Sequence, residues 1–251
     1  MTDLNQMHIG LIAAMPEEVG SALENIKEIQ ETQFGDLKIY SGKWFFDEGK
    51  SSFINLSIVW SGWGKVSSAR AATRLISCRY QDLPVNLIIF TGLAGAVDSS
   101  LNQGDIVIPN AVMMHDMDAR PIFKRFEIPA LKSDKLIPNK EWSDLVRNVF
   151  TKNALSRDMK FFKNVRTGLV ATGDKFISDN QSLKNLIKEI PDLMAVEMEG
   201  AAVAQVAVQE NIPWILIRVI SDGADDKASQ SFSDFVDSYK NYSWTLIETF
   251  L

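Results

Sequence analysis

The stretch Ala195-Val196-Glu197-Met198-Glu199-Gly200-Ala201-Ala202-Val203-Ala204 carries an apolar strand directly into a helix of small residues. Two carboxylates stand at the junction, and burying a carboxylate is costly unless hydrogen bonds or a ligand satisfy it. Glycine and alanine at the start of the helix let a ligand come close to the backbone. The stretch therefore predicts a strand–helix unit with polar chemistry where the strand ends.

The same change from strand to helix recurs along the chain. Continuous Ile, Leu and Val runs are typical of strands covered on both faces. Such runs predict strands over His8–Ala13, Leu37–Lys43, Phe53–Trp60, Leu87–Thr91, Asp105–Ile108, Val165–Ala171 and Trp214–Ile220. Helices are predicted over Glu17–Ile29, Lys65–Cys78, Lys140–Ala154, Asp179–Glu189, Gly200–Gln209 and Ser231–Leu251. This alternation predicts an α/β fold with a mainly parallel sheet.

The length fits one large α/β domain or two small ones, and the lack of an internal repeat or low-complexity linker favours a single domain over residues 1–251. The chain has 251 residues, 46% of them hydrophobic and 23% charged, which is ordinary for a globular protein. Its net charge of -6 argues against a nucleic-acid partner, because such domains carry a basic footprint. We therefore expect a single domain and no nucleic-acid binding.

Metal sites, secretion and membrane insertion are not predicted. A lone Cys78 excludes a cysteine-rich metal site, and His8 and His115 are too few for a histidine cluster. No basic flank or apolar core follows Met1, and no apolar run is long enough to span a bilayer. We expect a soluble, cytoplasmic protein.

Acidic and glycine-rich segments follow several predicted strands. In open α/β sheets, ligands bind outside the carboxyl ends of the strands. Glu17-Glu18 follows the first strand and Asp222 follows the last, with glycine-rich turns at Ser61–Lys65 and Thr91–Ala96 between them. Alone, Glu17-Glu18 is better explained by a helix dipole, and Asp222 is explained equally well by an N-cap. Neither turn matches a Walker or dinucleotide-binding motif. Their convergence favours one polar site.

Seven segments carry a family resemblance and occur in the family's order. They are Ile9–Glu18, Ser61–Lys65, Thr91–Gly95, Gly104–Val107, Gly173–Ile177, Val196–Glu199 and Arg218–Asp222. Together they resemble the bacterial 5'-methylthioadenosine/S-adenosylhomocysteine nucleosidases, within the nucleoside phosphorylase superfamily. The resemblance runs from about Met7 to the C-terminal helix. It implies a three-layer α/β/α fold with a central mixed, largely parallel twisted sheet.

The resemblance also implies a reaction and a set of catalytic groups. The reaction is hydrolysis of an N-glycosidic bond, which releases adenine and a 5-thioribose product in methionine salvage. Asp222 matches the general acid that protonates the purine at N7, and Glu18 matches the carboxylate that activates water. Arg218 is expected to hold that water or Glu18. Glu199 matches the acceptor of the ribose hydroxyls, and its charge favours a cationic transition state.

Further residues are implied to bind substrate. Phe176 is expected to stack on adenine, the backbone of Ile177 to read its edge, Met198 to contact the ribose and Phe232 to cover the sugar and the 5' substituent. Ala94, Gly95, Trp63, Leu93 and Ser221 complete the expected site. The resemblance implies no cofactor and no metal. It also implies a homodimer in which the loop of residues 115–123 lies near the partner's active site, and the apolar segment Val112–His115 supports this.

Three residues depart from the family pattern. Leu93 stands where a serine hydroxyl is usual, Trp63 replaces a smaller aliphatic residue, and Arg120 places a cation in the loop expected near the 5' group. A solvated surface arginine and a contact to an acidic 5' substituent are both open for Arg120. A futalosine- or aminofutalosine-type hydrolase therefore stays an alternative.

A phosphorylase and a non-catalytic relative differ from a hydrolase in the groups that they need. A purine nucleoside phosphorylase needs basic and glycine-rich groups to hold phosphate, but Met15-Pro16-Glu17-Glu18 follows the first strand here. A non-catalytic nucleoside-binding relative would not need Glu18, Glu199 and Asp222 together. Hydrolysis is the favoured prediction.

Overall fold

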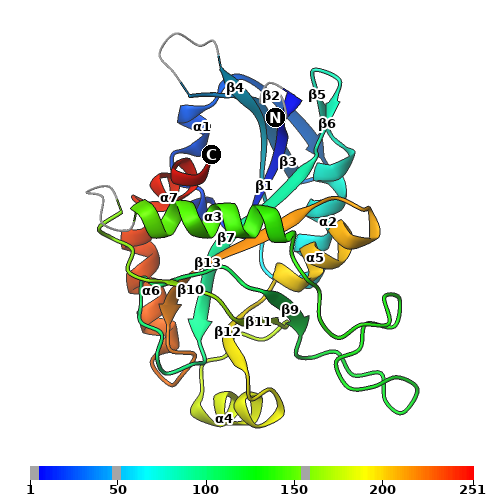
Figure 1. Ribbon diagram of the computed structural model, residues 1–251, viewed down its shortest axis with the longest axis vertical. Helices are drawn as coiled ribbons and strands as arrows, with labels where there is room; N and C mark the ends of the chain where they lie inside the picture. The colour runs from blue at the N-terminus through cyan, green and yellow to red at the C-terminus, as the bar shows by residue number, and fades with distance from the viewer. Residues whose placement is uncertain (1–5, 47–51, 154–158) are drawn as a thin grey trace.

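The computed structural model describes residues 6–46, 52–153 and 159–251 (Figure 1). Its strands are β1 (His8–Ala13), β2 (Lys27–Phe34), β3 (Leu37–Phe45), β4 (Phe53–Trp60), β5 (Arg79–Tyr80), β6 (Leu83–Pro84), β7 (Leu87–Ala96), β8 (Ile106–Val107), β9 (Ala111–Met114), β10 (Val165–Arg166), β11 (Leu169–Thr172), β12 (Leu193–Glu197) and β13 (Trp214–Asp222). Its helices are η2 (Pro16–Glu18), α1 (Ala22–Asn25), α2 (Lys65–Ser77), α3 (Lys140–Asn153), α4 (Asn180–Glu189), α5 (Gly200–Gln209), α6 (Ala228–Tyr239) and α7 (Ser243–Phe250). Ala154, the last residue of one predicted helix, lies outside the described residues.

A mixed sheet forms the centre of the fold. Its main path runs β10-β8-β13-β7-β1-β4-β3-β2, and β12, β11 and β9 branch from it at β7. The central strands β13, β7, β1 and β4 are parallel neighbours. β2, β3 and β4 pair antiparallel, as β12 does with the far end of β7. The prediction of a central, largely parallel mixed sheet is confirmed.

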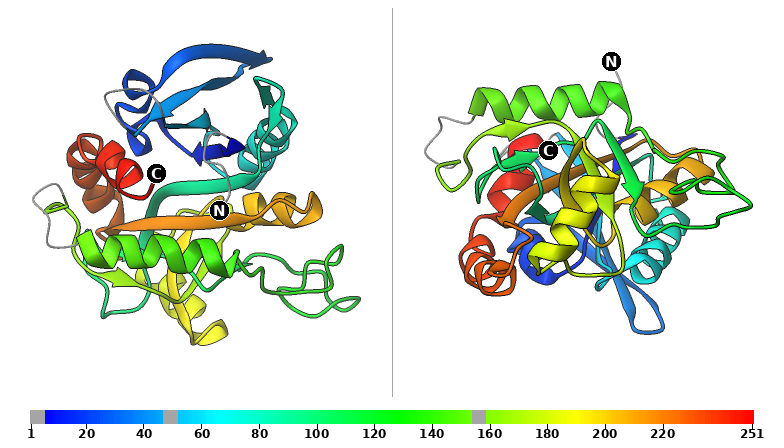
Figure 2. Two further views of the ribbon diagram at one scale, coloured as in Figure 1. Left: turned by 45° about the horizontal axis from the view of Figure 1, so that its top comes forward. Right: turned by 90° about the horizontal axis from the view of Figure 1, so that it is seen from below.

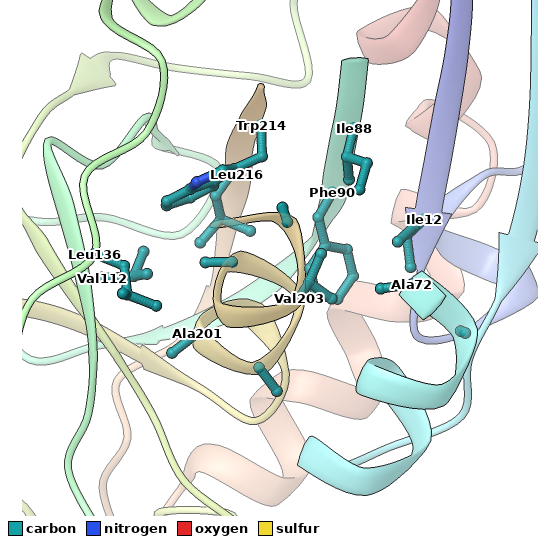
Figure 3. Packing of buried hydrophobic residues seen from close by; sticks show 14 of the residues in the cluster. Ile12, Ala72, Ile88, Phe90, Val112, Leu136, Ala201, Val203, Trp214 and Leu216 are labelled. Atoms are coloured by element: carbon teal, nitrogen blue, oxygen red, sulfur yellow. The ribbon is translucent and has the colours of Figure 1, made fainter. Parts of the chain in front are cut away.

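Helices cover both faces of this sheet, as the different views show (Figures 1 and 2). Side chains alternate along β1: Ile12 belongs to the apolar cluster under α2 and α5, whereas Leu11 belongs to the cluster with α3, α6 and α7. Figure 3 shows the first cluster, with Phe90 of β7 close to Val203 of α5. Two apolar clusters on opposite faces make three layers.

Helix α5 packs closely because its buried residues are small. Ala201, Ala204 and Ala207 are fully buried. Small side chains let the helix approach both the sheet and its neighbour α2, where Ala71 and Ala72 are also fully buried. This close approach sets the start of α5, and with it Glu199, against the end of the central sheet.

The chain between the first two strands departs from the prediction. The expected helix over Glu17–Ile29 is wrong: η2 and α1 are short, and the chain is already a strand by Lys27. β2 is an edge strand, and the structure leaves nearly all of its residues exposed, so it shows no apolar alternation. The sequence of β2 therefore has no hydrophobic periodicity from which a strand could be predicted.

Other boundaries also differ. The predicted strand over Val165–Ala171 is two strands, β10 and β11, and the predicted helix over Ser231–Leu251 is two helices, α6 and α7. Val112–His115 is not an exposed loop: it contains most of β9, and all four residues are buried within the protomer. Its apolar character is explained by the core, so it gives no support to dimerisation.

Candidate active site

One pocket opens at the carboxyl ends of the central strands. It is lined by Ala14, Met15, Glu18, Trp63, Leu93, Ala94, Gly95, Lys175, Phe176, Ile177, Val196, Glu197, Met198, Glu199, Ser221, Asp222 and Phe232. Every predicted site residue except Arg218 is in this lining. Segments far apart in the sequence thus meet at one cavity.

Glu18 is held by backbone N–H groups at the end of β1. Its Oε2 accepts from the N–H of Ala14 at 2.7 Å and of Met15 at 3.0 Å, and its Oε1 accepts from the N–H of Leu93 at 2.9 Å. Burial raises the pKa of the Glu18 carboxyl, and Arg218 and these N–H groups only partly oppose the rise. Glu18 is therefore a fixed carboxyl group with increased basicity.

Glycine at position 92 lets Glu18 and Arg218 approach each other. A side chain on Gly92 would begin 2.7 Å from Oε1 of Glu18 and 2.8 Å from Nη1 of Arg218. Both distances are shorter than real side chains show, and the obstructing groups are themselves buried. The predicted glycine-rich turn at Thr91–Ala96 is wrong, because β7 continues to Ala96. This strand needs glycine at position 92 because the side chains of Glu18 and Arg218 occupy the space above it.

Arg218 lies beneath the pocket and pairs with Glu197. Its Nη2 donates to Oε2 of Glu197 at 2.6 Å, and both side chains are about 1% exposed. Its guanidinium also stacks on the ring of Phe90, 4.0 Å from the centroid. No ion pair joins Arg218 to Glu18, so Arg218 acts on Glu18 only through its charge, which lowers the pKa of Glu18; that Arg218 holds the attacking water stays a prediction.

Glu197 is the polar residue for which the sequence predicted no role. Its Oε2 accepts from the N–H of Glu199 and of Gly200, and its Oε1 accepts from the hydroxyl of Thr172. Thr172 Oγ1 in turn accepts from the N–H of Ala201. Glu197 thus fastens the start of α5 to β11 and β13. The only sequence signal was its place beside Glu199.

Glu199 faces the pocket from the N-cap position of α5. Its Oε1 accepts from the N–H of Gly64 at 2.8 Å. Burial and the nearby charge of Glu197 raise the pKa of Glu199 to about 8, against the opposing effect of Arg218. β12 ends at Glu197, so strand alternation does not continue to Glu199: both residues line the pocket, but Glu199 accepts from Gly64 whereas Glu197 pairs with Arg218.

Asp222 ends β13 and has a hydroxyl neighbour. Its Oδ2 accepts from Oγ of Ser221 at 2.7 Å, and its Oδ1 accepts from the N–H of Ala224 at 2.9 Å. Burial raises the pKa of the Asp222 carboxyl despite both bonds. A carboxyl group that keeps its proton nearer neutral pH is suited to act as a general acid.

Three aromatic residues form the apolar side of the pocket. Phe232 of α6 makes edge-to-face contacts with Phe176, at 5.7 Å between centroids, and with Trp63, at 6.0 Å. Trp63 is 52% exposed, so it stands at the mouth. Phe176 follows β11, Phe232 lies in α6 and Trp63 follows β4. This wall is suited to a flat, apolar ligand group.

The arrangement combines acid–base groups with an aromatic wall. No group of three or more metal-ligating side chains occurs in the described ranges. None of the described helices is long and apolar enough to cross a membrane. Three buried carboxyl groups with raised pKa values, beside an aromatic surface, are suited to acid–base chemistry on a flat ligand group.

Comparison with known proteins agrees with this chemistry. Residues 8–251 match the model of the phosphorylase superfamily. A 5'-methylthioadenosine/S-adenosylhomocysteine nucleosidase of Haemophilus influenzae (strain PittGG) is 32% identical over 242 residues, which are 96% of this chain and 97% of the relative. The S-adenosylhomocysteine nucleosidase of Streptococcus pyogenes, crystallised with 5-methylthiotubericidin, has a TM-score of 0.83 at 31% identity, covering 97% of this chain and 95% of its own. The futalosine hydrolase of Helicobacter pylori strain 26695 has a TM-score of 0.82 at 25% identity and covers 97% of both chains.

Proposed function

This chain belongs to the phosphorylase superfamily, and we propose that it is an N-glycosyl hydrolase of 5'-methylthioadenosine and S-adenosylhomocysteine. The products are adenine and the 5-thioribose compound. The observation that carries the proposal is the gathering of Glu18, Glu199 and Asp222 around one pocket. Relatives that are about one-third identical over nearly the whole chain are named for this activity.

Asp222 is the proposed general acid. Departure of adenine places electrons on the purine, and a proton delivered to N7 makes it a better leaving group. The raised pKa of Asp222 keeps that proton available, and Ser221 orients the carboxyl through its hydroxyl. Such proton transfer contributes about 10²–10⁴-fold to a rate.

Glu18 is the proposed base for the attacking water. Its oxygens are fixed by three backbone N–H groups, so the carboxylate presents one geometry to a water molecule. Leu93 lacks the serine hydroxyl expected near that water, but its backbone N–H still orients Glu18. Arg218 acts indirectly. It forms an ion pair with Glu197, and its positive charge favours the ionised form of Glu18.

Glu199 is the proposed partner of the ribose hydroxyls. With a pKa of about 8 in the free protein, it takes up a proton easily when the pocket is empty. Hydrogen bonds from ribose favour the ionised form, and a cationic sugar favours it further in the transition state. Binding and reaction therefore both strengthen the interaction made by Glu199.

The remaining lining residues are proposed to hold the two ends of the nucleoside. Phe176 stacks on adenine, and the backbone of Ile177 reads its edge. Met198 packs on the ribose, and Phe232 covers it together with Trp63. Ala94 and Gly95 also line the pocket, and their small size allows a ligand to approach the backbone closely. The aromatic contacts of Phe232 support this arrangement.

Hydrolysis is favoured over phosphorolysis by the charge near β1. A phosphate nucleophile would approach the position of Glu18, where an ionised carboxylate repels it. Adenine release measured with and without inorganic phosphate separates the two reactions. Hydrolysis predicts equal rates, and a rate that depends on phosphate contradicts it.

Arg120 no longer supports the alternative of a futalosine-type hydrolase. Arg120 donates to Asp118 of the same loop at 2.6 and 2.8 Å, so its charge is already paired. The purified protein offered methylthioadenosine, S-adenosylhomocysteine and aminofutalosine should release adenine fastest from the first two. Fastest release from aminofutalosine overturns the substrate assignment, and release from none favours a nucleoside-binding protein.

A cytoplasmic homodimer acting in methionine salvage completes the proposal. Trp63 at the pocket mouth, Val66 in the first turn of α2 and Ile122 in the loop of residues 115–123 are exposed apolar side chains. The ion pair between Lys65 and Asp116 brings the start of α2 and the base of this loop together. A second subunit covering these residues explains their exposure in one chain. Light scattering should give twice the chain mass, and a fully active monomer contradicts the shared-site arrangement.

A further inference from the structure

Three charged residues outside the pocket tie its turns together. Lys65 begins α2, Asp116 follows β9 and Asp174 follows β11. Nζ of Lys65 lies 2.6 Å from Oδ1 of Asp116 and 3.6 Å from Oδ2 of Asp174. We call these three residues the ionic clasp. None of them is in the pocket lining.

Backbone groups complete the clasp. The N–H of Lys65 donates to Oδ1 of Asp174 at 2.8 Å, and the N–H of Asp174 donates to Oδ2 of Asp116 at 3.0 Å. β4 and β11 are not neighbours in the sheet, so no strand pairing joins the turns that follow them. The clasp supplies that connection outside the pocket lining.

The clasp lies one residue from the contact that holds Glu199. Gly64, just before Lys65, donates its N–H to Oε1 of Glu199 at 2.8 Å. Its φ of +92° suits glycine, and a side chain there would begin 3.0 Å from Oδ1 of Asp174. Any shift of Lys65 relative to Asp174 therefore moves the donor of Glu199.

We propose that the ionic clasp is a positioning device, in which Lys65, Asp116 and Asp174 hold the Gly64 N–H against Glu199 without touching the substrate. The same contacts hold Asp174, which directly precedes the pocket-lining residues Lys175 and Phe176. Asp116 stays ionised: burial alone would raise its pKa, but donation from Lys65 and from the Asp174 N–H lowers it below its ordinary value. The kinetic consequence rests on the proposed function, whereas the placement of Glu199 does not.

The pKa of Glu199 depends on the hydrogen bond that it accepts from the Gly64 N–H, so its titration measures whether this contact is intact. Glu199 is faced by Glu197 of β12, Arg218 of β13 and Glu18 of η2, and these groups are unchanged when the clasp is altered. Loss of the Gly64 N–H removes a donor to the carboxylate, which raises its pKa. Removing the charge of Lys65 and removing that of Asp116 have opposite through-space effects, but both release Gly64.

The experiment is a ¹³C NMR titration of protein labelled at glutamate carboxyls, with Glu199 assigned by its loss in Glu199→Gln. Lys65→Met and Asp116→Ala should both move the titration upward, each by about 0.5–1 pH unit. Lys65→Arg keeps the positive charge, so Glu199 should titrate close to its wild-type pH in that variant. Lys43→Met is the matched control, since Lys43 also makes a 2.6 Å ion pair, with Glu28 in the β2–β3 hairpin.

Shifts of opposite sign for Lys65→Met and Asp116→Ala mean that charge alone acts, and unchanged titrations mean that the clasp does not hold Glu199. Either result overturns the proposal. If Lys65→Met does not fold, the sign of the shift in Asp116→Ala still tests the proposal.

The kinetic test runs in parallel. kcat/KM for methylthioadenosine should fall about 10-fold in both variants, and the fall in kcat/KM at low pH should move to higher pH by the same amount as the NMR titration. A wild-type protein without activity rejects the proposed function and leaves the titration test intact.

Discussion

The two ends of β1 hold buried polar groups of opposite character. At its start, His8 Nδ1 lies 2.9 Å from the carbonyl of Leu83 and must donate to it, so Nε2 accepts from Ser57 at 2.7 Å. Ser57 in turn meets Ser41 at 2.6 Å. We call these three side chains the His8 network. Burial lowers the pKa of His8, which keeps the ring neutral.

Beyond the other end of β1, the pocket gathers the buried residues Glu18, Glu197, Glu199 and Asp222. One buried arginine, Arg218, pairs with Glu197 and acts through its charge on Glu18 and Glu199. The raised pKa values of Glu18, Glu199 and Asp222 record an unfavourable environment for their charges. Nε of Arg218 has no hydrogen-bond partner in the described part of the chain. A satisfied neutral network stabilises a fold, whereas crowded carboxyl groups at a cavity are poised for chemistry. Substitutions should therefore have opposite effects at the two ends.

The largest effect is expected for Asp222→Asn. Asparagine keeps the shape but cannot deliver a proton, so adenine release should fall about 10²–10⁴-fold while nucleoside affinity changes little. Steady-state release and calorimetric binding measure the two quantities. Asp192→Asn, which alters a surface ion pair with Lys135, is the control and should be unaffected. Release within a few-fold of wild type removes Asp222 from the mechanism.

Glu199→Gln should lose activity and gain stability. The folded-state pKa of about 8 exceeds the ordinary 4.5, so between these pH values the folded protein holds a proton that the unfolded chain releases. The stability of the wild type therefore falls as pH rises through this window, and glutamine removes that loss.

Thermal unfolding of the unliganded protein should show this difference. We expect the variant to melt several degrees higher at pH 8.5, at about 2–4 °C per kcal/mol, and near the wild type at pH 4.5. Activity should fall about 100-fold. A variant that melts below the wild type at pH 8.5 contradicts the raised pKa.

Ser57→Ala should show the opposite pattern. It leaves Nε2 of His8 without its donor, which costs about 1–2 kcal/mol of unfolding free energy. kcat/KM should stay unchanged, because the His8 network lies at the far end of β1. Ser77→Ala at the exposed end of α2 should change neither quantity. A loss of activity without a loss of stability would show that the two ends of the strand are coupled.

The smallest effect is expected for Trp63→Leu. Trp63 occupies the mouth of the pocket beside Phe232, so a smaller side chain makes room for a longer 5' substituent. The ratio of kcat/KM for S-adenosylhomocysteine to that for methylthioadenosine should rise about 10-fold. Trp44→Leu, on β3 away from the pocket, should leave the ratio unchanged. A constant ratio in Trp63→Leu means that Trp63 only covers the pocket.

The sequence predicted the pocket better than it predicted its internal contacts. Glu18 and Asp222 lie at the carboxyl ends of β1 and β13, which both pair parallel with β7 and so end at one edge of the sheet. Glu199 follows β12, which reaches the same edge through its antiparallel pairing with the far end of β7. The pairing of Arg218 with Glu197 was missed because it depends on the antiparallel joining of β12 to β7. No local pattern encodes that junction. The edge strand β2 was missed for a similar reason, since its stability comes from pairing with β3.

The hydrolytic step itself is tested most directly by cleaving methylthioadenosine in ¹⁸O-labelled water. If Glu18 activates water, mass spectrometry should find one labelled oxygen at C1 of the thioribose product and unlabelled adenine. Glu18→Gln should lower the rate of this labelling about 10²–10⁴-fold. A sugar without the label, or a sugar phosphate as the product, would contradict the account of three acids acting on one nucleoside.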